Sequence, residues 1–413
     1  MDHSRKMIAG LGSLALAAAG TVAFATSALA SGSVTVGITT ALSGPIAELG
    51  QTGLQAIELA AADANAKGGV LGKQVKVVSA DSNLSPATGA TNVRNFILDN
   101  HAVAIFGPVS SAVAVAEEGV AAKYKTPIFF STSNDVKLAT TNYTKYMFQV
   151  VPDTHMEPAA VARYLADAVG KKHITIATIT PDYSFGRDTV ASFLKSLKAD
   201  GVNYTVKAQE TPKLGASQYT SYIAALIAAH PDYTFMGQFG GDLVTLTKQA
   251  EGFGFFKHTK PMAMYGRAQL KALKGKVPAG AIAWDRAPFW AMKGPGMEKF
   301  SEAYNAKYHE WPSAWAVMGY TAFETWAQGV EKAHSFNGDK VSAALSGATI
   351  KTIRGPITLR ACDHQGDVGE YVGTIAAKVN PKYGFQTYAH SKLIPAKDII
   401  LSCKITTAEQ PKS

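Results

Sequence analysis

The 413-residue sequence has only two cysteines, and it lacks the short motifs that mark common cofactor sites and catalytic centres. It contains neither a GxxxxGKS or GxxxxGKT phosphate loop nor a GxGxxG run after a strand, so neither type of nucleotide site is indicated. A GxSxG nucleophile elbow and an HExxH zinc motif are also missing. The ten histidines are dispersed and match no zinc-ligand spacing. We therefore predict no metal, no cofactor and no enzymatic activity.

Charge is also scarce and evenly spread. Charged residues make up 17% of the chain and hydrophobic residues 47%, the balance of an ordinary globular protein. The net charge is +9, from 40 basic and 31 acidic residues. A nucleic-acid partner would require a clustered basic patch, whereas the basic residues form only short pairs such as Lys171 and Lys172. No nucleic-acid partner is expected, and the length suggests two domains.

The first 30 residues have the pattern of a secretory signal peptide. Arg5 and Lys6 form a charged start, and an uncharged run rich in alanine, leucine and glycine follows. Ala28 and Ala30 fit the small-x-small cleavage pattern, which leaves Ser31 as the new N-terminus. A retained membrane anchor is the alternative, but so many alanines and glycines make the run weakly apolar. We predict cleavage and export of a soluble protein.

The two cysteines are Cys362 and Cys403. Export into an oxidising compartment favours one disulfide between them, and closing so long a loop stabilises a fold by a few kcal/mol. Two separate buried thiols are the alternative.

Short apolar strands alternate with longer amphipathic helices over residues 34–130, and the alternation resumes after Asp153. Each run predicts a mainly parallel sheet with helices on both faces. Residues 295–345 predict helices without strands, which would cover a sheet already built, and late strands are expected at 355–359 and 371–377. A chain that returns to an earlier lobe crosses between lobes more than once, which makes a hinge and a closing cleft.

The predicted fold class is therefore α/β, with two doubly wound lobes joined by a multi-crossover hinge. After the signal peptide at residues 1–30, the first lobe is expected at 31–150 plus about 285–354. The second lobe is expected at 151–284 plus about 355–413.

Three polar stretches follow predicted strands. Residues 106–111 open a helix with Ser110 and Ser111, where hydroxyls and free N–H groups suit a carboxylate, although these serines could simply cap the helix. Residues 129–134 end in a polar run at the equivalent position of the next strand, where open α/β sheets bind ligands; turn formation is the alternative. Residues 237–242 combine glycines that admit a ligand with an aspartate that could be a helix cap.

These stretches, and the order of the elements, resemble the periplasmic binding proteins of branched-chain amino-acid ABC importers. The similarity extends from about Val34 to near the C-terminus. The motifs that carry it are LSGP at 42–45 with Gly50, DANAKGGVLG at 63–72, Asp81, GPVSS at 107–111 and DYSFG at 182–186.

The resemblance implies two doubly wound lobes, three crossovers between them and a ligand held between the lobes. It assigns the ligand carboxylate to Ser111, further polar contacts to Thr132 and Asn134, and second-lobe contacts to Phe185 and Phe239. The complete predicted ligand-binding set is Leu49, Ser110, Ser111, Thr132, Ser133, Asn134, Tyr183, Phe185, Phe239 and Arg267.

Three positions depart from the family pattern. Many amino-acid binders have tyrosine at the positions of Leu49 and Phe239, and a glutamate near Arg267 for the α-ammonium group. An arginine favours a carboxylate instead. The expected ligand is thus an amino acid or a related aliphatic or aromatic carboxylate without the amine, with Asp153 or Asp242 as alternative ammonium partners.

The expected function is solute capture for the membrane permease of an ABC importer, by a monomer. Two alternatives stay open: a ligand-sensing module of a regulatory or receptor system, which uses the same fold, and a secreted hydrolase, which would need a nucleophile and base.

Overall fold

The first of the two large sheets has five parallel strands. The computed structural model describes residues 32–44 and 46–412, so the expected signal peptide and Pro45 of the LSGP motif lie outside the described residues. The strand order is β2 (Gln74–Asp81), β1 (Ser33–Thr40), β3 (Ala102–Gly107), β4 (Ile128–Phe130) and β5 (Met147–Gln149). Its helices are α1 (Ala47–Ala66), α2 (Pro86–Leu98), α3 (Ser111–Lys123), α10 (Ala314–Ala333) and α11 (Gly338–Leu345). This is the predicted doubly wound lobe.

Alternating strand side chains explain why helices cover both faces of this sheet. Phe106 and Phe129 point to one face, where Phe106 packs 6.3 Å from Phe323 of α10, measured between ring centroids. Ile105 and Phe130 belong to a separate core on the other face, with α2 and α3. The period of two in a strand sends consecutive apolar residues to opposite faces, so a fully buried strand is apolar throughout.

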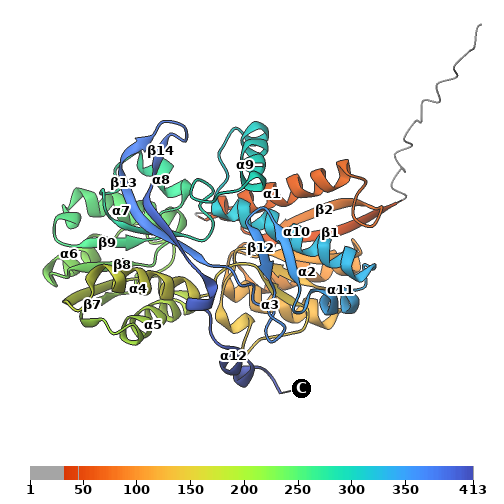
Figure 1. The fold of residues 1–413 in the computed structure, drawn as a ribbon, viewed down its shortest axis with the longest axis horizontal. Coiled ribbons are helices and arrows are strands. Elements are labelled where there is room, and N and C mark those ends of the chain that lie inside the picture. Colours follow the sequence, from red (N-terminus) through yellow and green to blue (C-terminus); the bar gives the residue numbers. More distant parts are fainter. Residues whose placement is uncertain (1–31, 45, 413) are drawn as a thin grey trace, which may run out of the picture.

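The second sheet has seven strands and takes its last two from the end of the chain. Its order is β14 (Phe385–Ile394), β13 (Glu370–Asn380), β10 (Ile282–Asp285), β9 (Lys260–Ala263), β8 (Tyr233–Met236), β6 (His173–Ile179) and β7 (Asn203–Glu210). Strand β13 pairs antiparallel with both β10 and β14, and the other neighbouring strands of this sheet pair parallel. The helices of this part are α4 (Met156–Val169), α5 (Ser184–Ala199), α6 (Thr220–Ala228), α7 (Gly240–Gly252) and α8 (Arg267–Leu273). The two sheets form separate lobes, side by side in Figure 1. The predicted α/β fold class is confirmed.

The chain passes between the lobes near residues 150–155, 286–294 and 359–369. Helix α9 (Pro295–Tyr308) belongs with the first lobe, since the hydroxyl of Tyr304 donates to Gln55 Oε1 of α1 over 2.6 Å. The hairpin of β11 (Thr349–Thr352) and β12 (Gly355–Thr358) also packs there, through Ile350 and Leu359. The boundary expected at residue 354 is wrong, because it cuts through this hairpin; the third crossover comes later.

Arg354, in the β11–β12 turn, ties two crossovers together. Its guanidinium donates to the carbonyl of Val150 over 3.1 Å and to the carbonyl of Arg286 over 2.9 Å. Gln365 of the third crossover donates to the carbonyl of Val151 over 2.7 Å. The three crossovers therefore lie side by side, as a hinge requires.

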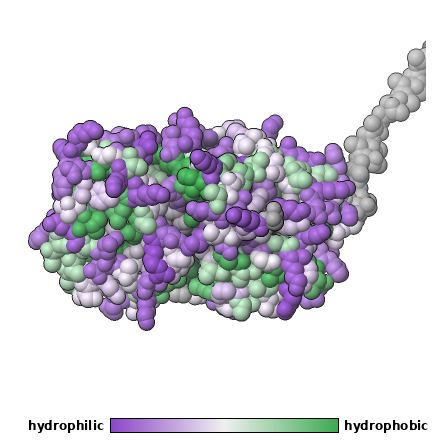
Figure 2. Space-filling model, turned by 90° about the horizontal axis from the view of Figure 1, so that it is seen from below, coloured by the Kyte–Doolittle hydropathy of each residue, from purple (hydrophilic) through white to green (hydrophobic). Residues whose placement is uncertain are grey.

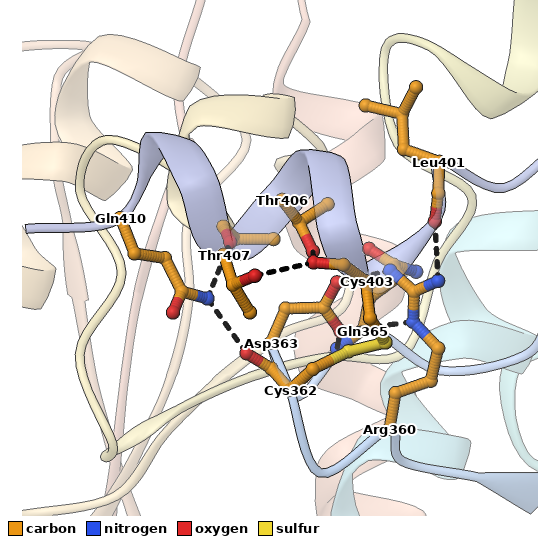
Figure 3. The surroundings of a disulfide bond; sticks show 10 residues. Arg360, Cys362, Asp363, Gln365, Leu401, Cys403, Thr406, Thr407 and Gln410 are labelled. Atoms are coloured by element: carbon orange, nitrogen blue, oxygen red, sulfur yellow. Dashed lines mark hydrogen bonds and ion pairs between the residues drawn. A yellow bond between two sulfur atoms is a disulfide. The ribbon is translucent and has the colours of Figure 1, made fainter.

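The structure joins Cys362 and Cys403 in a disulfide, which attaches helix α12 (Cys403–Glu409) to the third crossover (Figure 3). Gln410, just after α12, donates to the carbonyl of Cys362 over 2.8 Å and to that of Ala139 in the first lobe over 3.3 Å. His364, near the disulfide, stacks on Phe148 of β5 at 4.6 Å. The C-terminal segment leaves β14 of the second lobe and so ends against the first (Figure 1).

Within the described part of the chain, no helix is both long and apolar enough to cross a membrane. Figure 2 shows hydrophilic residues distributed over both lobes on the lower face, with hydrophobic residues in scattered groups.

Candidate functional site

A cavity lies between the lobes, where two strands of the first sheet end. Its lining residues are Leu49, Val109, Ser111, Thr132, Asn134, Tyr183, Phe185, Phe239, Met264, Arg286 and Trp315. The free space at its centre is about 20 Å³, which is enough for about one water molecule. The lobes are closed on the site, so a ligand enters only when they separate.

Ser111 is the first residue of α3 and is buried. Gly107 ends β3 with φ of +156°, and a Cβ there would lie 2.3 Å from the carbonyl oxygen of Thr39, so the turn requires glycine. Ser110 occupies the N-cap position, but its side chain makes no capping hydrogen bond. The free N–H groups of the first turn and the Ser111 hydroxyl thus lie together at a helix N-terminus, where carboxylates are stabilised.

The loop after β4 supplies Thr132 and Asn134 to the cavity. The side-chain amide of Asn134 donates to the carbonyl of Pro152 over 3.0 Å and to Glu157 Oε2 over 3.1 Å. Asn134 therefore holds the first crossover against the loop as well as lining the cavity. Ser133, between them, is buried outside the cavity.

Aromatic side chains of the second lobe form the opposite wall. Phe185 and Phe239 meet edge to face at 5.4 Å, and Tyr183 stacks on Phe185 at 5.9 Å. Burial raises the pKa of the Tyr183 hydroxyl, which stays neutral. A Cβ at Gly240 would lie 3.5 Å from Leu49 Cδ1, which shows how closely the lobes approach.

Arg286 is a lining residue that the sequence did not predict. It follows β10 in the second crossover, and both its side chain and that of Glu157 are 3% exposed. Its Nε donates to Glu157 Oε2 over 2.9 Å, its Nη1 donates to the Thr132 carbonyl over 2.7 Å, and its Nη2 lies 2.9 Å from Glu157 Oε2. The guanidinium carbon lies 5.1 Å from the centroid of the Trp315 ring. An arginine has five N–H donors, so these three contacts leave two.

Arg267 does not line this cavity. It lies in an adjacent space, where its guanidinium pairs with Glu48 and with Glu310 at 2.8 Å each. Glu48 belongs to α1 of the first lobe, whereas Arg267 begins α8 of the second. Burial raises the pKa of Glu48, and the charge of Arg267 offsets part of that shift. Arg267 thus links the two lobes and lines the adjoining space instead of this cavity.

Replacing Arg267 by methionine should weaken ligand affinity about three- to thirtyfold, because it removes two interlobe ion pairs worth up to ~1 kcal/mol each from the closed form. Isothermal titration at low and high salt measures the loss. Lys392, which pairs with Asp167 within the second lobe, supplies the control K392M. Equal affinity for R267M and wild type would remove this link from the closing mechanism.

The other acids expected near the ligand lie elsewhere. Asp153 accepts the N–H groups of His155 and Met156 at the start of α4, and burial raises its pKa to about 6. Asp242 accepts the N–H of Gly215 over 2.7 Å, and burial raises its pKa. Neither lines the cavity, and Ser110 does not either. Across residues 32–44 and 46–412, no three metal-ligating side chains gather into a cluster.

Comparison with known proteins decides the family. The sequence model of periplasmic binding proteins matches residues 33–379. The chain belongs to the periplasmic binding protein family. This binding protein is 28% identical over 339 residues to Leu/Ile/Val-binding protein homolog 7 of Brucella abortus, covering 78% of this chain and 83% of the relative.

Two solved structures share the fold. A periplasmic binding protein of Burkholderia mallei superposes with a TM-score of 0.81 at 24% identity, over 91% of this chain and 98% of that one. An ABC-transporter solute-binding protein of R. palustris in complex with benzoate gives a TM-score of 0.76 at 19% identity, over 88% and 97% of the two chains.

Proposed function

We propose that this binding protein captures a small carboxylate-bearing solute between its lobes in the periplasm and delivers it to the permease of an ABC importer. The main observation behind this proposal is the interlobe cavity, which is lined both by Ser111 at the N-terminus of α3 and by Arg286. The family match and the Leu/Ile/Val-binding and benzoate-binding relatives support an amino acid or a small aromatic or aliphatic acid.

The proposed carboxylate site combines three kinds of donor: the Ser111 hydroxyl, the first N–H groups of α3, and the two remaining N–H groups of Arg286. Hydrogen bonds to an ionised acceptor are stronger than those between neutral groups. Glu157 balances the charge of Arg286, so no ligand is needed to neutralise the guanidinium. The lobes can therefore close without burying an unpaired cation.

The rest of the cavity suits an apolar ligand body. Leu49, Val109, Met264, Phe239 and Trp315 supply apolar or aromatic surface from both lobes. Opening exposes this surface to water, and closure on a ligand buries it again, so the ligand favours the closed form. The permease then recognises the closed arrangement of the two lobes.

Binding without turnover is part of the proposal. Hydrolysis through a serine needs a base within hydrogen-bond reach. In the described residues, no histidine lines the cavity, and Ser111 therefore has no such partner there. Mass-spectrometric recovery of the bound solute unchanged after prolonged incubation tests this point.

Replacing Ser111 by alanine should weaken binding about 10- to 100-fold, because a hydrogen bond to a charged group contributes ~1.5–3 kcal/mol. Wild-type protein is first screened by thermal shift against L-leucine, L-phenylalanine, benzoate and 3-phenylpropanoate, since a ligand that binds only the folded state raises Tm. Titration calorimetry with the acids that bind then compares the two proteins.

Ser342, a buried serine on α11 far from the cavity, supplies the control S342A. The control should bind as wild type does. Unchanged affinity of S111A would refute the carboxylate site, and the absence of binding by any acid in the panel would refute the proposed ligand class.

A further inference from the structure

A second small cavity adjoins the ligand cavity and shares three of its walls, Phe239, Met264 and Trp315. Its polar lining comes from Arg267, Gln269, Asp285 and Ser313, and Gly266 forms part of its wall. Since the same three side chains line both spaces, a ligand that extends past them from the first cavity would reach the second.

Asp285 is the last residue of β10 and directly precedes Arg286. Its side chain is buried, with 1% of the residue exposed, and Oδ2 has no hydrogen-bond partner among the described residues. The N–H groups of Arg286 and Ala287 point to this carboxylate, yet burial still raises its pKa to about 7. A buried carboxylate oxygen without a donor is costly, so a donor from a ligand would be strongly favoured.

None of the neighbouring charged groups donates to this oxygen. Arg286 is held by Glu157, and the terminal nitrogens of Arg267 are held by Glu48 and Glu310, while Nε of Arg267 has no partner among the described residues. Arg354 donates to two backbone carbonyls, and burial raises the pKa of Glu370.

Gly266 keeps the space in front of this oxygen open. A Cβ at Gly266 would lie 3.2 Å from Asp285 Oδ2 and 3.2 Å from Gln269 Oε1. Two acceptor oxygens thus converge on one point of the cavity wall. With φ of −78°, Gly266 has a backbone that any residue adopts, so what its missing side chain provides is room.

We propose that Asp285 and Gln269 form a donor-binding subsite that accepts an N–H or O–H group that the ligand carries in addition to its carboxylate. This rests on the proposed function. It narrows the ligand to acids with a hydrogen-bond donor, either an ammonium group, as in amino acids, or a hydroxyl group.

The test compares acids that differ only in the donor. L-phenylalanine is paired with 3-phenylpropanoate for the ammonium group, and 4-hydroxyphenylacetate with phenylacetate for the hydroxyl group. Titration calorimetry measures each with wild type, D285N and D242N, the last as a matched carboxylate outside both cavities.

In wild type, the donor-bearing member of one pair should bind at least about tenfold more tightly, since a buried acceptor rejects the analogue that lacks the donor. D285N should reduce that ratio to below about threefold and leave the donor-free acid nearly unchanged, whereas D242N should retain the wild-type ratio. Which pair responds identifies the donor.

A second variant, G266A, fills the same space without changing charge, and it should also reduce the ratio. It covers the case in which D285N fails to fold. If D285N still binds the donor-bearing acid as selectively as wild type does, the subsite is overturned. When D285N cannot be purified, the same result with G266A overturns it. Equal affinity for the two acids in both pairs would also overturn it. Binding of donor-free acids alone would overturn the subsite and leave the proposed function standing; no binding of any acid would overturn both.

Discussion

Replacing Arg286 by methionine is expected to destabilise the protein by about 3 to 5 kcal/mol and to reduce acid binding by at least about tenfold. The substitution removes the cation that faces Glu157 and leaves that carboxylate buried and only partly satisfied, by Asn134 and Trp284. It also removes donors from the proposed carboxylate site. Urea denaturation measures the free energy of unfolding, and titration calorimetry measures affinity for the tightest acid of the panel.

The double variant E157Q/R286M separates the two effects. Removing the unpaired carboxylate should restore much of the stability, because the large cost comes from leaving one charge without its partner. Binding should stay weak, because the donors to the ligand are still missing. Full recovery of binding in the double variant would show that Arg286 acts only by holding Glu157.

Loss of the disulfide should lower the free energy of unfolding by about 4 kcal/mol. The bond spans a sequence separation of 41 residues, and closing a loop of that length restricts the unfolded chain by roughly this amount. The variant C362S/C403S, unfolded in urea, gives the difference from oxidised wild type.

Reduced wild type is the control, because it should unfold at the same urea concentration as the double variant. If oxidised wild type and C362S/C403S unfold together, the bond is either unformed or balanced by strain. A gain in ligand affinity on reduction, with stability lowered, would indicate that the bond opposes closure.

Much of the fold could be predicted because the strands of the first lobe are apolar on both faces and regularly spaced. The late strands were harder to predict. Strand β10 has only four residues and β14 mixes polar and apolar residues at the edge of a sheet. Short strands are stabilised by their neighbours in space, which local periodicity does not record.

The first-lobe part of the site was predictable for the same reason. Ser111 and Thr132 follow adjacent parallel strands, whose carboxyl ends meet at one edge. Asp285 ends a short strand that pairs with the far end of the chain, and Arg286 follows it, so the neighbouring elements in sequence do not mark the cavity. The charged pair Asp285 and Arg286 directly after the apolar residues 282–284 was the available signal.

Arg267 shows why a family resemblance does not predict every contact of a residue. The family resemblance places a ligand-binding glutamate near Arg267, yet the terminal nitrogens of Arg267 pair with two glutamates of the other lobe and its Nε has no partner among the described residues. The sequence shows the residue but not which of several acids lies opposite it.

The C-terminal helix adds a covalent connection beside the hinge. Helix α12 follows the last strand of the second lobe, and its disulfide and Gln410 bind it to the third crossover and to the first lobe. In Figure 1 it lies below the junction, and α9 lies above it. The disulfide closes residues 362–403 into a loop that contains β13 and β14, so the last two strands of the second lobe are anchored at both ends to the same crossover.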